Sequence, residues 1–209
     1  MALRRRAPSV SGNPSRSADM NDPLAWALAN ARQQTLALVA DIPSERMTEQ
    51  SLPGERHPLW ILGHLLLGDT YLLSLLGVES LSSDFDGLLR HYGPGAEPTP
   101  RLEEYDSKAI LMDRLSATGT RRVEVVRRMT VADLGQGMPD PYLAQAQPTI
   151  AHHLLALVCH EGYHAGQLSV WRRTHGLQPA RWVFAPIEPA GEPAPSCPRD
   201  PATKPPLIT

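Results

Sequence analysis

The chain has 209 residues and a formal net charge of −2, from 20 Lys and Arg against 22 Asp and Glu. This length suits one domain with a single core, and the balanced charge argues against nucleic acid as a main partner. Two cysteines make no disulfide framework and are typical of a reducing compartment, so we expect a cytoplasmic protein. The longest apolar run, residues 59–76, is interrupted by His64, Gly68 and Asp69, which predicts a buried helix and no membrane span.

The two ends of the chain are expected to lie outside the folded domain. Residues 1–20 are basic and rich in Ser and Pro, and they lack the apolar stretch of a signal peptide. Because Met20 directly precedes the first organised segment, it stays open whether residues 1–19 belong to the native protein. The proline-rich residues 178–209 predict a second disordered tail, in which residues 180–187 are a candidate docking stretch.

Two helices are expected in the first half of the domain, which we place at residues 21–177. Asp22 as N-cap and Pro23 in the first turn begin an amphipathic helix over residues 22–41. A second helix, over residues 58–77, also has proline in its first turn and is apolar almost all round. Such a helix must be buried on several sides, which is consistent with a subunit contact or with a central position in one subunit.

Two further long helices follow a loop that is rich in Gly and Pro and holds only a short helix, over residues 84–91. The third long helix is expected at residues 107–129; its small residues 117–120 are either a weak point or room left for a ligand. Thr149 can cap a fourth helix over residues 150–175. With no convincing strand, the pattern predicts an all-α fold.

Eight histidines occur in the chain, and three of them are candidate ligands for one metal ion. His160 and His164 are four residues apart in the fourth helix, so their rings lie about 40° apart on one face. His64 is the natural third ligand, because an imidazole on the buried side of an apolar helix needs a polar partner or a metal. We expect His57 to cap or to orient another group and His153 to lie too far along the helix. No ligand role is expected for three others: His91, His152 and His175.

Residues 160–164, HEGYH, also match the zinc-peptidase pattern H-E-x-x-H, in which the glutamate is the general base. A peptidase of this type usually needs a further ligand downstream and an edge strand that holds an extended peptide. The chain has a helix end and a proline-rich segment there. A zinc peptidase is therefore the less favoured of the alternatives.

The motifs WILGHL (residues 60–65) and HEGYHAGQLSVWRRTHGL (residues 160–177) resemble the second-helix and fourth-helix signatures of the DinB-like (DinB/YfiT) superfamily. This resemblance implies a four-helix bundle, a homodimer and a divalent metal ion, with zinc favoured over nickel or iron. By position it implies three metal ligands: His64, His160 and His164. Relatives include S-transferases that use bacillithiol or mycothiol, among them a maleylpyruvate isomerase, so a low-molecular-weight thiol is an expected co-substrate.

The expected function is that of a metal-dependent enzyme, of thiol S-transferase or hydrolase type, acting on a small molecule; the alternative is a bundle with a non-catalytic metal. Glu161 is either a proton acceptor or orienting group near the ion, or a solvated surface residue. Tyr163 and Gln167 are candidates to line the pocket. Packed core positions are expected for Trp60, Tyr71 and Cys159.

Overall fold

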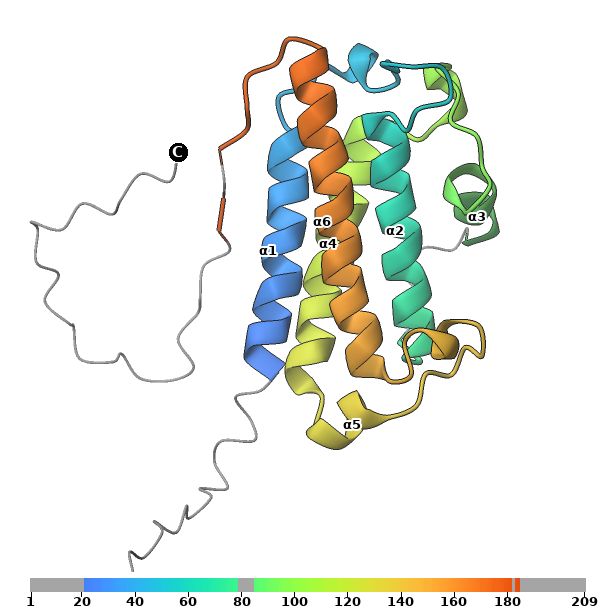
Figure 1. The fold of residues 1–209 in the computed structure, drawn as a ribbon, viewed down its shortest axis with the longest axis vertical. Coiled ribbons are helices and arrows are strands. Elements are labelled where there is room, and N and C mark those ends of the chain that lie inside the picture. The colour runs from blue at the N-terminus through green and yellow to red at the C-terminus, as the bar shows by residue number, and fades with distance from the viewer. Residues whose placement is uncertain (1–20, 79–84, 182, 185–209) are drawn as a thin grey trace, which may run out of the picture.

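The computed structural model describes residues 21–78, 85–181 and 183–184, and within these ranges every regular element is a helix. The expected all-α fold is confirmed. Four long helices lie side by side as a bundle: α1 (Asn21–Val39), α2 (Pro58–Leu75), α4 (Lys108–Arg128) and α6 (Ile150–Thr174) (Figure 1). The expected N-terminal tail, and residues 185–209 of the expected C-terminal tail, lie outside the described residues.

Shorter helices cover the ends and one side of the bundle. Helix α3 (Phe85–Tyr92) packs against α2, and α5 (Val131–Gly135) packs against α6. Single 3₁₀ turns occupy connections at Ser44–Arg46, Leu102–Glu104 and Leu143–Gln145. The expected bounds of the long helices and of α3 hold to within two residues, whereas α5 and the 3₁₀ turns were not expected.

Helix α2 owes its apolar composition to its position inside one subunit. It packs against α3, α4 and α6, and 72% of its length is buried within the chain. By length and composition alone α2 could cross a membrane, but its burial identifies it as the core helix of the bundle. A subunit contact is therefore not required to explain its apolar surface.

The chain beyond α6 continues along the bundle for several residues. Arg172 donates two hydrogen bonds to the carbonyl oxygen of Gln178, and the Val183 amide donates to Oε1 of Gln34 at 3.1 Å. Ala180 packs against the main core cluster. Gln178, Ala180 and Val183 thus contact the domain, whereas residues 182 and 185–187 of the candidate docking stretch lie outside the described residues.

His57 begins α2 as its N-cap, which is one of the two roles expected for it. Its Nδ1 accepts the Trp60 amide at 3.1 Å, so its Nε2 carries the proton and donates to the Thr99 carbonyl at 3.0 Å. The ring is completely buried. Burial lowers the pKa of His57 to about 4, although the carbonyls of Thr99 and Met47 act in the opposite direction.

Acid should therefore destabilise the fold through His57. Its folded-state pKa lies below the ordinary value, so the stabilisation is complete above about pH 6.5 and is lost as pH falls toward 4. In His57→Asn, which keeps a good N-cap, we expect the loss of unfolding free energy between pH 7 and pH 4.5 to be smaller by roughly 2 kcal/mol. Urea unfolding at both pH values measures this difference, and equal acid sensitivity of the two proteins would contradict it.

Candidate metal centre

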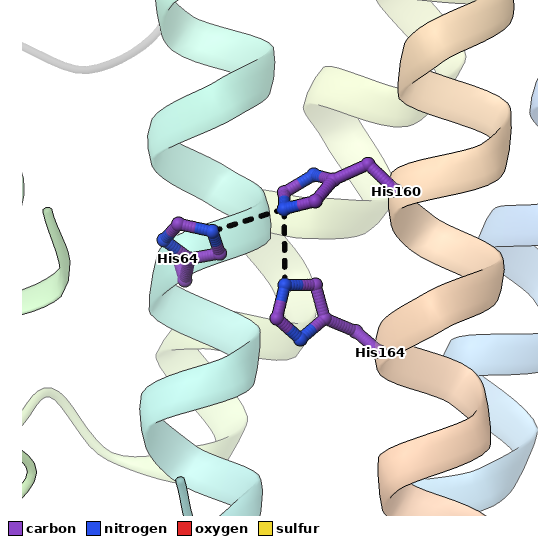
Figure 2. Close-up of side chains that lie close together, drawn as sticks. All are labelled: His64, His160 and His164. Carbon is purple, nitrogen blue, oxygen red and sulfur yellow. Dashed lines mark hydrogen bonds between the residues drawn. The ribbon is translucent and has the colours of Figure 1, made fainter. Parts of the chain in front are cut away.

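Three histidines from two helices bring their Nε2 atoms together. His64 comes from the middle of α2, and His160 and His164 come from successive turns of α6 (Figure 2). The Nε2 atom of His160 lies 3.1 Å from that of His64 and 3.0 Å from that of His164. Among the described residues, these three therefore form a group that could hold a metal ion, as the sequence predicts.

Hydrogen bonds at the far side of two rings fix which nitrogen carries the proton. His64 Nδ1 lies 2.7 Å from the backbone carbonyl of Tyr92, which can only accept, so Nδ1 is the donor. His164 Nδ1 likewise donates to Oε1 of Gln167 at 2.7 Å. In the neutral state both Nε2 atoms are then bare lone pairs that face His160, and the single Nε2 proton of His160 can satisfy only one of them.

Protonation of a further ring nitrogen, which would relieve the repulsion between these lone pairs, is unfavourable. Burial is the largest cause that lowers the pKa of each of the three rings. For His164, burial together with the charges of His160 and His64 lowers the pKa to about 3. The rings are therefore neutral near pH 7, which is the state that ligates metals.

The spacing and donor type fit a divalent cation. Nitrogens bound at about 2.05 Å to a tetrahedral zinc ion stand roughly 3.3 Å apart, so the two separations from His160 Nε2 need only a slight opening. Three imidazoles leave a fourth position open in such a geometry. His64 and His160 are partly exposed, whereas His164 is buried.

Gly63 makes the orientation of His64 possible. A Cβ atom at this position would overlap the Tyr92 ring, so only glycine allows α3 to approach α2 this closely. Tyr92 is 3% exposed, and its carbonyl lies beside the His64 ring as a result of this approach. The Trp60 ring stacks on the His64 imidazole, with the ring centroids 4.7 Å apart and the planes at 12° to each other.

Gln167 and Tyr163 form a hydrogen-bonded chain that ends at the centre. Gln167 accepts from His164 through Oε1 and donates to the Tyr163 hydroxyl at 3.1 Å through Nε2. Tyr163 is 59% exposed and its ring lies edge-on to that of His164. Both residues thus lie beside His164, with Gln167 orienting its ring and Tyr163 at the surface.

The comparison with protein families agrees with this arrangement. The family model described as the DinB superfamily matches residues 27–168, which includes α2, α4 and the histidine pair of α6. The chain belongs to the DinB superfamily. No curated protein is similar enough to be matched. The helical bundle described above is the fold of this superfamily.

In this DinB-superfamily chain Glu161 points away from the three histidines and into the bundle. It is 1% exposed and pairs with Arg32 of α1 at 2.6 Å and with Arg122 of α4 at 3.2 Å. The expectation of a solvated surface glutamate is therefore wrong. Both carboxylate oxygens already accept hydrogen bonds from guanidinium groups, so the geometry does not favour a role as proton acceptor.

Asp69 of α2 completes this buried group, which we call the ion network: Arg32, Asp69, Arg122 and Glu161. Both arginines reach Asp69 as well, at 2.8 and 2.6 Å. Burial by itself would raise the pKa of Asp69, but the two guanidinium groups outweigh it and hold the pKa below its ordinary value. The network thus brings two guanidinium groups and two carboxyl groups into direct contact inside the bundle.

The small residues in the middle of α4 leave room for Arg32, which corrects the expectation of a weak point or of space for a ligand. A Cβ atom on Gly119 would lie 3.1 Å from Cγ of Arg32. Thr118, its neighbour, is buried and donates from its hydroxyl to Asp69 at 3.0 Å. Both residues therefore belong to the surroundings of the ion network.

Other expected positions are partly right. Trp60 is buried in the core as expected, whereas Tyr71 is only half-buried. The Tyr71 hydroxyl donates to Asp140, and this hydrogen bond is the largest cause that raises the pKa of Tyr71 to about 12. Cys159 is exposed, so the expectation of a packed thiol is wrong, because this position of α6 faces solvent. His153 is not a candidate ligand; it hydrogen-bonds Gln147.

A groove of about 660 Å³ runs between α1 and α6 and is separate from the candidate metal centre. Its α6 wall includes Gly162, Ala165 and Gly166. At 100° per residue these positions lie on the side of α6 opposite His160 and His164. The groove therefore does not contribute to the ligand environment of the three histidines.

Neutralising Glu161 should destabilise the protein strongly. Glu161→Gln leaves two buried guanidinium groups short of one negative charge, and breaking a buried ion group costs about 3–5 kcal/mol. The matched control is Glu124→Gln, which removes a pair with Arg121 at the surface of α4 and should cost under about 1 kcal/mol. Denaturant unfolding measures both losses, and losses of equal size would contradict the proposed importance of the network.

Proposed function

We propose that the protein binds one divalent metal ion, zinc by preference, through Nε2 of His64, His160 and His164, and acts on a small molecule at the open position. The observation that carries this proposal is the convergence of three neutral imidazoles, of which His64 and His164 have their outer nitrogens held by Tyr92 and Gln167. Metal-ligating histidines typically donate their other ring N–H to such a carbonyl or amide oxygen.

A bound ion would supply an activated nucleophile, because coordination lowers the pKa of a thiol or a water toward neutrality. The chain's own residues provide orientation. Tyr92 and Gln167 hold the rings of His64 and His164 in the tautomer that presents Nε2. Because Gln167 donates to the Tyr163 oxygen, the hydroxyl proton of Tyr163 is left to hydrogen-bond a substrate.

We favour thiol transfer or hydrolysis with a low-molecular-weight thiol as co-substrate over peptide hydrolysis. A peptidase of the H-E-x-x-H type needs its glutamate beside the metal-bound water. Here the Glu161 carboxylate pairs with Arg32 and Arg122. The second candidate is a bundle with a structural metal, which is supported by the fact that the three ligands would join α2 to α6 directly.

Purified protein should contain about one metal ion per chain, and His64→Ala should lose it. The matched control is His152→Ala, an exposed histidine of the same helix α6 as two of the ligands, which should keep full metal content. Elemental analysis measures the content. A ratio near one that survives His64→Ala would eliminate the three-histidine site.

The same proteins give the pH dependence of metal binding. Because burial lowers the pKa of all three ligands, protons compete with the metal only below about pH 6.5, the ordinary value for histidine. We expect constant affinity between pH 8 and 6.5 and a fall at lower pH. At metal concentrations 100 times the dissociation constant, binding should stabilise the fold by about 2.7 kcal/mol.

Turnover is tested with metal-loaded protein, a panel of small electrophiles and each of three thiols: bacillithiol, mycothiol and glutathione. We expect adduct formation with at least one thiol, lost on chelation, and a roughly 10-fold lower kcat/KM in Tyr163→Phe from the missing hydrogen bond. Mass spectrometry detects the adducts. If chelation unfolds the protein and no adduct or hydrolysed product forms after metal is restored, the structural-metal alternative replaces the enzyme.

A further inference from the structure

An exposed arginine lies at the edge of the candidate metal centre. Arg56 precedes His57, the buried N-cap of α2, so its backbone is held while its side chain is exposed. Its guanidinium carbon lies 5.0 Å from the centre of the Trp60 ring. Trp60 in turn stacks on the His64 imidazole. Arg56, Trp60 and His64 therefore form one continuous series of contacts that leads to the candidate metal centre.

The positive charge of Arg56 acts on all three histidines of the candidate metal centre. After burial, which is the largest cause, the Arg56 cation is among the influences that lower the pKa of His64, His160 and His164. A fixed positive charge at this place also opposes the binding of a metal cation. On metal binding alone, an arginine here is thus unfavourable.

Arg56 keeps its hydrogen-bonding capacity for something outside the chain. Within the part of the chain that the structure describes, its guanidinium contacts the Trp60 face and forms no ion pair with a carboxylate. Arg101, by comparison, is an exposed arginine of the following loop that pairs with Glu104. A guanidinium that lies over an indole face makes a cation–π contact, which does not use its N–H groups, and these can still bind an anion.

We propose that Arg56 anchors a carboxylate of the ligand that occupies the three-histidine site. The planar guanidinium fork matches the two oxygens of a carboxylate, and the contact of Arg56 with Trp60, which itself stacks on His64, places the fork one aromatic ring away from a candidate metal ligand. The inference rests on the proposed metal site and narrows its substrate class to acids. It also gives a reason for the positive charge, since a carboxylate bound by Arg56 would offset that charge near the cationic centre.

The test uses the full chain loaded with one equivalent of zinc and three small thiols that differ in charge: mercaptoacetate, 3-mercaptopropionate and the neutral 2-mercaptoethanol. Calorimetry gives the affinity of each. We expect Arg56→Ala to weaken the better of the two acids about 10-fold or more, as for loss of a charge-assisted hydrogen bond, and to change 2-mercaptoethanol less than 2-fold. Arg56→Lys should recover part of the loss, because it restores charge without the fork.

A second readout needs no thiol. Chelator competition should give a zinc affinity for Arg56→Ala that is a few-fold tighter than for the unchanged protein, because a nearby positive charge is gone. Arg128→Ala, an exposed arginine at the end of α4, is the matched control and should change neither measurement.

The outcomes separate this inference from the function on which it rests. If the unchanged protein binds no zinc, both fail. If zinc and 2-mercaptoethanol bind but Arg56→Ala weakens acids and 2-mercaptoethanol equally, or weakens neither, the carboxylate anchor is wrong and the metal site stands. Selective loss of the acids together with tighter zinc binding supports both.

Discussion

Four charged side chains buried at the centre of the bundle determine how its long helices lie against one another. Each member of the ion network comes from a different helix: Arg32 from α1, Asp69 from α2, Arg122 from α4 and Glu161 from α6. Each arginine contacts both acids, so the group is neutral as a whole. Separating any one charge from its partners would leave it unpaired in a low-dielectric interior, at a cost of several kcal/mol. Rotation or sliding of any long helix is therefore opposed at this level of the bundle.

This constraint also directs the candidate metal centre, because Glu161 is the chain neighbour of His160. With Glu161 fixed toward α1 and α4, the geometry of a helix turns His160 and His164 toward α2. The same α6 backbone thus presents a pair of candidate metal ligands on one side and a buried charge on another. Such packing on rigid helices is what keeps ligand geometry within the narrow tolerance that a metal site requires. Within the H-E-x-x-H pattern the two histidines thus face α2, and the glutamate faces the arginines of α1 and α4.

The sequence predicts the helices and the three histidines well because both depend on local or periodic signals. Proline in the first turn, the Thr149 cap and the i, i+4 spacing of His160 and His164 can be seen without knowing what lies opposite. The ion network could not be predicted in this way, because pairing across four helices has no periodicity in one chain. In the sequence alone Asp69 interrupts an apolar helix and the small residues near Gly119 resemble a weak point, whereas in the fold Arg32 contacts both. The same holds for Glu161: its angle on the helix is predictable from the sequence, but its partners on other helices are not.

The orientation of His64 depends on the backbone carbonyl of Tyr92, so the residue that must be kept is the one that lets this carbonyl come close. Any amino acid at position 92 would bring a carbonyl oxygen, so the tyrosine side chain is not what holds the imidazole. Gly63, in contrast, must remain a glycine, because any side chain there would keep α3 from coming close enough. The fidelity of the centre therefore depends on a residue that has no functional group. A relative that keeps all three histidines but has a larger residue at this position would have lost the means to aim the first of them.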